Sequence, residues 1–344
     1  MKNNMVLDTL FYPFEAGVLP WPAEEGRVLF LNAQAHKALS HFPSANFTAQ
    51  QFFYPYADAL KARGFDVQPV LPQEAQQFDF VLLAAPKNQV ETMHLIAGGL
   101  RALKPGGLFL VAADNKAGGA RLAKNLGHFG LEDIRSDTRN KCRVCWAIKQ
   151  AVDEDAIDAA LRGGAPQPIA DGAFQSWPGI YGWQKIDAGS ALLLQHLPAD
   201  LKGRGADFGC GYGFLSDHVL QYYEVRSLIC ADADWRALAM CRVNLERFES
   251  KAEIHFEWSD LTQNPGFSNL DFIVMNPPFH EGTAADISIG KRFIVNAHQS
   301  LKRGGTLWMV ANKQLPYESV LEETFFKIEK IFEGQGFKIF CATK

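Results

Sequence analysis

The stretch Asn276 to Phe279, with the sequence NPPF, ends an apolar run and could bind an amino group attached to an aromatic ring. Such an amine is a poor nucleophile because its lone pair is delocalised into the ring. Two acceptors could bind both N–H groups and leave the lone pair free to attack: the side-chain oxygen of Asn276 and the carbonyl of Pro277, which the Pro-Pro sequence restrains. Phe279 offers a ring on which a nucleobase could stack. These three residues are the candidate catalytic residues.

A second stretch, ADFGCGYG, has the composition of a cofactor-binding loop. It follows a predicted strand, and glycines there let the backbone approach a ligand at the carboxyl edge of an open α/β sheet. The next two predicted strands end in acids, Asp232 for the hydroxyls of a ribose and Asp260 for the amino group of an adenine. The residues assigned to the cofactor site are Asp207, Gly209, Gly211, Gly213, Asp232, Asp260 and Asn276.

The spacing of the glycines separates two classes of nucleotide-binding enzyme. A dinucleotide-dependent dehydrogenase carries GxGxxG. This chain has GxGxG followed by Phe214 and, further on, the NPPF corner. That combination resembles the S-adenosylmethionine (SAM) methyltransferases, so SAM is the expected cofactor. Because the transferred methyl carries a sulfonium leaving group, positioning and dipoles can supply most of the catalysis, and a general base is not obligatory.

Short β-branched and aromatic runs alternate with helical stretches in both halves of the chain, which predicts layered α/β sheets. In the second half the predicted strands are 206–208, 227–231, 253–257, 271–275, 306–311, 327–332 and 337–342. Only EGQG separates the last two strands, which is too short for a parallel crossover, so the sheet should end in an antiparallel hairpin. A mostly parallel sheet with this ending is the arrangement of class I SAM methyltransferases.

Four motifs occur twice in the same order, which predicts a duplication. The copies lie 177, 192, 198 and 195 residues apart: GRVLFLNAQAHKAL and GRGADFGCGYGFLS, FDFVLLAAPKN and LDFIVMNPPFH, LKPGGLFLVAADNK and LKRGGTLWMVANK, CRVCWAIK and FKIFCATK. We predict two tandem Rossmann-like domains, residues 1–150 and 173–344. Residues 151–172 are acidic and then rich in Gly, Pro and Ala, and we interpret them as a linker.

The first copy lacks the residues for this chemistry. Asn32, Gln34 and His36 stand where the second copy has its three glycines, and AAPK replaces NPPF. We therefore expect a degenerate N-terminal domain that does not bind SAM and that serves in RNA docking or in supporting the fold. Its strip RSDTRNKCRVCWAIK carries five basic residues against one acid. Arg139, Lys141 and Arg143 are candidate phosphate ligands, although a solvated hairpin face accounts equally well for these charges.

The composition excludes several classes of protein. With 344 residues, 47% hydrophobic and 21% charged, and a net charge of -4, the chain is not a polycation that coats nucleic acid. No segment is apolar enough to cross a bilayer, and the N-terminus has no apolar signal region, so we expect a cytoplasmic protein without a membrane partner. The six cysteines are sparse, which favours reduced thiols. The single CxxC, at Cys142 and Cys145, has no second pair, so we predict no metal site.

The stretches IDAGSALLL, DFGCGYG and NPPFH, with the decayed first half, resemble the bacterial ribosomal RNA guanine-N2 methyltransferases of the RsmC and RlmG family. The resemblance covers essentially the whole chain. It implies transfer of a methyl group from SAM to the N2 amine of a guanine in ribosomal RNA, with Asp187 and Ser190 near the methionine end of SAM. The tryptophan-rich SWPGIYGW and the length favour the small-subunit branch of the family, whose target is guanine 1207 of 16S rRNA, and hence a small ribosomal subunit or its assembly intermediate as partner.

Three alternatives stay open at this point. One is a large-subunit member of the same family. Another is a protein-glutamine or DNA-adenine N-methyltransferase, although the aromatic residue of the corner is often Tyr there and a decayed twin is not usual. The third is a ribosome-assembly factor that binds RNA without catalysis. The intact Gly209, Gly211, Asp232 and Asn276 argue against that third reading.

Overall fold

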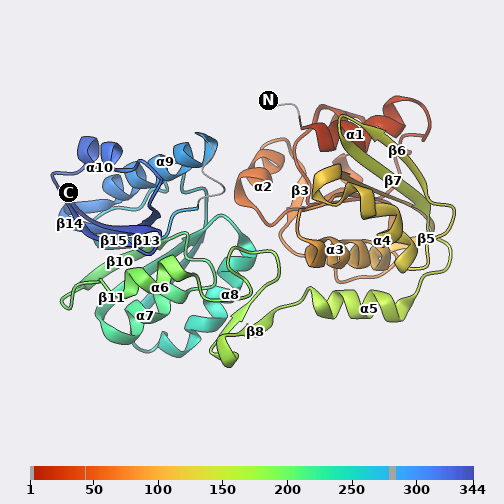
Figure 1. Cartoon of the computed structure of the whole chain (residues 1–344). Coiled ribbons are helices and arrows are strands. Elements are labelled where there is room, and N and C mark those ends of the chain that lie inside the picture. Colours follow the sequence, from red (N-terminus) through yellow and green to blue (C-terminus); the bar gives the residue numbers. More distant parts are fainter. Residues whose placement is uncertain (1–3, 43, 279–283) are drawn as a thin grey trace. The chain divides into compact units, whose positions relative to one another are not determined.

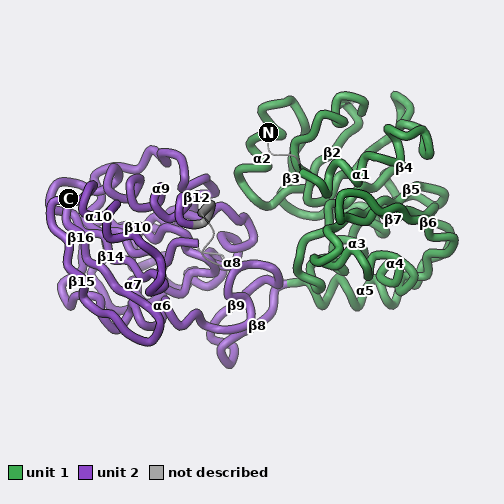
Figure 2. The backbone as a smooth tube through the Cα atoms, turned by 45° about the horizontal axis from the view of Figure 1, so that its top comes forward, with its two compact units in different colours: residues 1–165 green, residues 166–344 purple. Residues whose placement is uncertain are grey.

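The computed structural model describes residues 4–42, 44–278 and 284–344. The chain forms two compact units, Met1–Ala165 and Pro166–Lys344 (Figures 1 and 2). Part of the stretch interpreted as a linker is regular structure: helix α5 (Glu154–Gly163) belongs to unit 1, and strand β8 (Gln167–Ile169) begins unit 2. Asp153 caps α5 by accepting a hydrogen bond from the backbone N–H of Ala156 (2.9 Å).

Unit 1 contains one seven-stranded sheet. Its strands are β1 (Val28–Leu31), β2 (Phe47–Gln50), β3 (Asp66–Gln68), β4 (Phe78–Ala84), β5 (Leu103–Asp114), β6 (Arg135–Arg139) and β7 (Cys142–Ile148). Its other helices are α1 (Met5–Glu15), α2 (Tyr54–Lys61), α3 (Gln89–Ala102) and α4 (Leu122–His128), with short 3-10 helices η1 (Lys37–His41), η2 (Ser44–Asn46), η3 (Asn115–Ala117) and η4 (Gly119–Arg121).

Unit 2 contains a second seven-stranded sheet and a small hairpin of β8 with β9 (Phe174–Ser176). The sheet strands are β10 (Lys202–Phe208), β11 (Glu224–Asp232), β12 (Glu253–Trp258), β13 (Leu270–Met275), β14 (Leu301–Asn312), β15 (Lys327–Gly334) and β16 (Phe337–Thr343). The helices are α6 (Ala188–Leu194), α7 (Phe214–Tyr222), α8 (Trp235–Leu245), α9 (Ala284–Ser300) and α10 (Glu318–Thr324), with 3-10 helices η5 (Ala170–Gly172) and η6 (Glu246–Phe248).

The two sheets have the same topology. The strand order is β3-β2-β1-β4-β5-β7-β6 in unit 1 and β12-β11-β10-β13-β14-β16-β15 in unit 2. In each sheet the first five strands are parallel, and the last two form an antiparallel hairpin that also pairs antiparallel with the fifth strand. The predicted hairpin is confirmed: Gln335 and Gly336 both have positive φ, as a tight turn between twisted strands requires. The predicted α/β class with two tandem Rossmann-like domains is likewise confirmed.

Apolar residues of the parallel strands supply the cores. In unit 2, one cluster includes Phe293 and Leu321 from α9 and α10, and the other includes Leu193 and Val219 from α6 and α7. The sheet therefore has helices on both faces, as a buried parallel sheet needs. This arrangement leaves the strand ends, where polar side chains collect, as the open edges of the layer.

A structural contact at the amino edge is repeated in both units. In unit 1, Asp79 accepts hydrogen bonds from the backbone N–H of Arg27 (2.9 Å) and from Nζ of Lys104 (2.7 Å). In unit 2, Asp271 accepts a hydrogen bond from the backbone N–H of Arg204 (2.7 Å) and pairs with Lys302. The duplication thus kept residues that tie strands together at this edge, while the opposite edge diverged.

Candidate functional site

The glycine loop after β10 adopts left-handed backbone at all three glycines. The φ angles are 76° at Gly209, 55° at Gly211 and 93° at Gly213. A Cβ on Gly211 would meet no atom within 4 Å, so this glycine faces open space. A Cβ on Gly213 would lie 2.9 Å from Sγ of Cys241, so this glycine is required for packing α7 against α8. The three glycines therefore have different roles, which their sequence spacing does not distinguish.

Asp207, the next-to-last residue of β10, is completely buried beneath the loop. Its Oδ2 accepts a hydrogen bond from Oγ of Ser216 (2.6 Å), and its Oδ1 has no partner in the described part of the chain. Burial raises the pKa of Asp207 to about 7. Asp207 therefore supports the loop from below rather than lining the open pocket.

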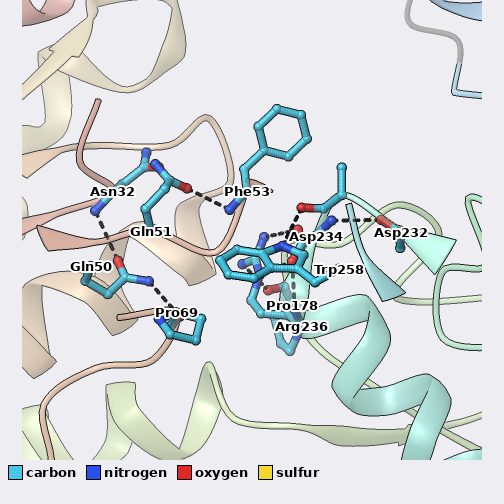
Figure 3. Close-up of polar contacts among 11 residues, drawn as sticks. Asn32, Gln50, Gln51, Phe53, Pro69, Pro178, Asp232, Asp234, Arg236 and Trp258 are labelled. Carbon is cyan, nitrogen blue, oxygen red and sulfur yellow. Dashed lines mark hydrogen bonds and ion pairs between the residues drawn. The ribbon is translucent and has the colours of Figure 1, made fainter. Parts of the chain in front are cut away.

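Asp232, the last residue of β11, organises the neighbouring strand exit (Figure 3). Its Oδ2 accepts from the backbone N–H of Gly211 (2.9 Å) and its Oδ1 accepts from that of Asp234 (2.8 Å). Burial raises the pKa of this carboxyl to about 6. The two backbone donors fix the orientation of the carboxylate, which keeps further lone pairs for ligand hydroxyls.

The segment before α6 is attached to this edge by Arg236. Its Nε donates to Oδ1 of Asp234 (3.1 Å) and its Nη2 to Oδ2 (2.8 Å), while Nη1 donates to the carbonyl of Pro178 (3.4 Å; Figure 3). At the end of β12, Nε1 of Trp258 donates to the carbonyl of Ala233 (2.9 Å). Arg236 and Trp258 thereby connect three segments beside the second and third strand exits.

Asp260 follows β12, as the sequence predicted for the third acid. Its Oδ1 accepts from the backbone N–H (2.9 Å) and Oγ1 (2.6 Å) of Thr262. These bonds form a local turn and leave Oδ2 available at the exit of β12, the strand that pairs with β11. The carboxyl end of β12 therefore offers a carboxylate oxygen next to the carboxyl end of β11.

Asn276 lies directly after β13, and its amide is held in one orientation. Its Nδ2 donates to Oδ1 of Asp187 (2.8 Å) and to Oγ of Ser190 (2.9 Å), residues that precede it by 89 and 86 positions. Its Oδ1 is buried and has no partner in the part of the chain that the structure describes. An acceptor oxygen is thus held in place without a donor. Pro277 is buried next to it, whereas Phe279 and His280 lie outside the described residues.

Asp187 is the centre of this network. It caps α6 by accepting from the backbone N–H of Ser190 (2.8 Å), and its Oδ2 accepts from the hydroxyl of Tyr181 (3.0 Å). Partial burial and the nearby Asp187 carboxylate raise the pKa of Tyr181, so the phenol stays protonated and donates. The sequence analysis assigned no role to Tyr181. Its only signal was membership of the aromatic stretch SWPGIYGW.

Some of these residues line a pocket of about 440 Å³, part of which is open to solvent, whereas the predicted site residues Asp207, Gly213, Asp232 and Asp260 do not line it. The lining groups come from the segment before α6, from the glycine loop and from the NPPF corner: Tyr181, Gly182, Asp187, Ser190, Gly209, Cys210, Gly211, Tyr212, Phe214, Leu215 and Asn276. The structure therefore brings together Gly209, Gly211 and Asn276 with the two residues that the resemblance implied. Tyr212, whose pKa burial raises to about 12, is a further lining residue that the sequence did not single out.

The corresponding edge of unit 1 is filled by its own side chains (Figure 3). Asn32, at the position of Gly209, has a φ of 51° and donates from Nδ2 to the carbonyl of Ala84 (2.8 Å). Gln51 occupies the position of Asp232. Its Oε1 accepts a hydrogen bond from the backbone N–H of Phe53 (2.8 Å), two residues later, as Oδ1 of Asp232 accepts from that of Asp234. Its Nε2 donates to the carbonyl of Ala33 (2.6 Å). Side-chain amides and backbone groups thus form hydrogen bonds with one another at these strand ends.

Helix α1 closes the rest of this edge. Asn4, the N-cap of α1, donates from Nδ2 to Oε1 of Gln34 (2.7 Å), and Asp8 lies 3.0 Å from Nε2 of His36. The ring of His36 stacks on Phe11. Gln34 and His36 occupy the positions of Gly211 and Gly213, so the Gln34 side chain stands where Gly211 leaves open space in unit 2.

The candidate RNA-binding residues lie on and beside the β6–β7 hairpin. Arg139 is exposed and its guanidinium lies 4.4 Å from the centre of the Tyr12 ring, and Lys141 is in the exposed turn. Arg143 is half-buried, and its Nε is buried without an acceptor in the described structure. Lys149, from the same basic strip, is buried and donates to two backbone carbonyls. The strip is therefore not one uniform surface.

Two general features accompany the site. None of the described helices combines the length and the apolar character needed to cross a bilayer. Within the described ranges, His, Cys, Asp and Glu side chains form no group of three or more placed to hold a metal ion. The six cysteines are free thiols, and five of them are buried.

Both halves of the chain match families of known domains. Residues 171–341 match the Methyltransferase small domain, and residues 24–160 match the Methyltransferase small domain N-terminal. A solved structure, the 16S rRNA N2 G1207 methyltransferase (RsmC) of T. thermophilus in complex with AdoMet and guanosine, is similar with a TM-score of 0.78. The alignment covers 98% of this chain and 91% of that one at 24% identity, which supports the same two-domain fold.

Three relatives carry the name ribosomal RNA small subunit methyltransferase C. That of Shewanella loihica is 30% identical over 271 residues, 78% of each chain. That of Shewanella halifaxensis is 30% identical over 292 residues, 84% of each chain. That of Shewanella amazonensis is 28% identical over 328 residues, 93% of this chain and 95% of the relative. The resemblance seen in the motifs is confirmed, and the chain belongs to the ribosomal RNA small subunit methyltransferase C family.

Proposed function

We propose that this chain transfers a methyl group from SAM to the exocyclic N2 amine of a guanine in 16S rRNA. The observation that carries the proposal is the orphaned, buried Oδ1 of Asn276, held beside the cofactor loop by Asp187 and Ser190. Family membership supports the substrate class. The T. thermophilus relative acts on guanine 1207 of 16S rRNA, and we propose the corresponding guanine here.

The residues of unit 2 fit SAM as the methyl donor. Gly211 leaves open space in the pocket, and the oriented carboxylate of Asp232 lies 2.9 Å from its N–H. Asp232 would accept from the ribose hydroxyls and Asp260 from the adenine amine, while Asp187 and Ser190 lie where the methionine end is expected. When bound, SAM supplies an electrophilic methyl group on a sulfonium sulfur.

The protein contributes acceptors and orientation for the amine. Oδ1 of Asn276 would accept one N–H of the guanine amine, and the carbonyl of Pro277 would accept the other. Withdrawing both hydrogens from the ring plane localises the lone pair on nitrogen, which favours attack on the methyl. Neither acceptor has to become protonated during attack, so the leaving proton can pass to solvent. Phe279 is proposed as the stacking surface for the base.

The proposed setting is the cytoplasm, with the small ribosomal subunit or its assembly intermediate as the substrate. The experiment is mass mapping of modified guanines in rRNA from a strain that lacks the gene. N2-methylation at guanine 1207 of 16S rRNA should disappear, and the wild-type chain should restore it whereas Asn276→Ala should not. Loss of a modification in 23S rRNA instead, or of an adenine or protein-glutamine methyl group, would reject the proposed target.

A further inference from the structure

The carboxyl edge of the unit 1 sheet carries a row of five cations: Lys87, Lys116, Arg121, Arg139 and Lys141. Lys87 follows β4, and Lys116 and Arg121 follow β5. Strand β7 is antiparallel, and its first residue, Cys142, pairs with Asp114, the last residue of β5. The β6–β7 turn therefore lies at the same edge. Because β4, β5, β7 and β6 are neighbours in the sheet, the five residues line adjacent strand ends.

All five side chains are exposed, and the described structure shows no ion pair for any of them. The acids at this edge are already used: Asp8 faces His36, and Asp114 accepts from the backbone N–H of Lys116 (2.7 Å). At the amino edge of the same sheet two cations are paired, Lys104 with Asp79 and Arg101 with Asp158, while Arg135 is exposed. The carboxyl edge therefore carries the longer row of cations without an ion pair in the described structure.

The corresponding edge of unit 2 lacks this charge. The backbone N–H of Asn115 donates to the carbonyl of Lys141 (2.9 Å), and that of Lys313 donates to the carbonyl of Gly336 (2.8 Å), so these turns are equivalent. By the same register Gly334 and Gln314 replace Arg139 and Lys116. The cations near the unit 2 hairpin, Lys313 and Lys330, are both paired with Glu333. Among the residues that the structure describes, such a row of unpaired cations is found in unit 1 and not at the equivalent positions of unit 2.

We propose that this edge, which lost its cofactor pocket, is a docking surface for the phosphate backbone of the rRNA substrate. On a chain whose net charge is -4, this row of cations without ion pairs forms a local basic surface, and phosphates would neutralise it with release of counterions. The surface contains Arg139 and Lys141 and extends across Lys87, Lys116 and Arg121. Arg143, being half-buried, is left out. This inference rests on the proposed function, since it assumes an RNA substrate.

The test uses the full chain and a 16S rRNA transcript, with affinity measured over a range of salt concentrations. The variant Lys87→Glu/Lys116→Glu is compared with Arg135→Glu/Arg162→Glu. The control pair changes the net charge equally at exposed positions away from the row, with Arg135 at the opposite end of β6 from Arg139. The Lys pair should lose at least about tenfold in affinity, and its log-log salt slope should fall by about 0.9 per lost contact.

Three results decide the matter. Equal affinity and equal salt slope in the two pairs, in folded protein that still binds SAM, would overturn the docking surface. An equal loss in both pairs would also overturn it, because total charge rather than position would then govern binding. The milder Lys87→Gln/Lys116→Gln should lose less affinity than the reversal but in the same direction. Failure of the proposed function looks different: the wild type would then bind the transcript but methylate no guanine in unmodified small subunits.

Discussion

The amide of Asn276 illustrates how a single side chain is prepared for chemistry. A primary amide has two N–H donors, and here both are used by acceptors, Asp187 and Ser190. Rotating the amide by half a turn would place its oxygen against those acceptors, which is unfavourable. The oxygen is therefore kept on the pocket side, where it costs about 1–3 kcal/mol as an unsatisfied acceptor until a donor arrives.

Replacing Asn276 by alanine tests this directly. If Oδ1 acts mainly on the amine in the transition state, Asn276→Ala should lower kcat by about a hundredfold or more. The dissociation constant of SAM should change much less. Steady-state kinetics on small subunits and calorimetry with SAM give the two quantities. A parallel loss of both would identify Asn276 as a cofactor or structural residue.

Asp187 should act through Asn276, and the chain offers a matched control. Asp187 caps α6 through the N–H of Ser190 (2.8 Å), and Asp153 caps α5 through that of Ala156 (2.9 Å). Each alanine variant should lose about 1 kcal/mol of stability through its cap. Only Asp187→Ala should also reduce kcat, since the amide of Asn276 is then free to turn. Equal kinetics in the two stable variants would show that Asp187 is merely a cap.

At the scale of elements, two glycines of the loop between β10 and α7 have different roles: Gly211 leaves space for the ligand and Gly213 allows close packing. Gly211→Asp places a carboxylate in open space but beside Asp232, so SAM binding should be lost, with a smaller fall in melting temperature than for Gly213→Ala because Asp tolerates left-handed backbone better. Gly213→Ala forces a Cβ to 2.9 Å from Cys241 in left-handed backbone, so the melting temperature should fall. Thermal unfolding and calorimetry separate the two effects. The reverse pattern would contradict these assignments.

Local sequence patterns were enough to predict the elements that end in a characteristic residue. The closing hairpin, the strands before Asp232 and Asn276, and the shared topology of both halves followed from periodicity and repeated motifs. Helix α5 lies in the stretch interpreted as a linker, because that stretch is acidic and then rich in Gly, Pro and Ala and leaves room for a short helix at best. Helix α5 packs against α3. The helical propensity of its own sequence does not show this tertiary contact, which stabilises the helix.

Contacts between distant positions were beyond the sequence. Nothing in the spacing shows that Asp187 holds the amide of Asn276, 89 residues away, or that the hydroxyl of Tyr181 donates to Asp187. The same limit applies to charge: the basic strip looked continuous, yet Lys149 is buried and Arg135 lies at the far end of its strand. Such facts depend on which strand ends meet, and that is a property of the folded sheet.

At the scale of the whole molecule, two acids with raised pKa values, the buried Asp207 and the half-buried Asp232, make stability depend on pH. Burial raises the pKa of Asp207 to about 7 and that of Asp232 to about 6, against about 4 in an unfolded chain. Between those values the folded state holds more protons, so the free energy of unfolding should fall as pH rises from about 4 to 7. Asp207→Asn keeps an acceptor for Ser216 but cannot titrate, so its decline should be shallower. Denaturation across this pH range that gave identical slopes would refute the assignment.

The duplication also fixes how many cofactors one chain can hold. In unit 1, Asn32 reaches from the position of Gly209 to the carbonyl of Ala84, and Ala84 itself stands at the position of Asn276. Polar groups at these strand ends therefore hydrogen-bond with one another, and the edge offers neither open space for a cofactor nor an acceptor for an amine.

Calorimetry should accordingly give one SAM per chain, and Gly211→Asp should abolish all binding rather than half of it. Adding Asn32→Gly, Gln34→Gly and Gln51→Asp to the wild type should not create a second site, because Asn4 and Asp8 of α1 still border the loop. A second site in the wild type, or binding that survives Gly211→Asp, would mean that unit 1 kept its ligand after all.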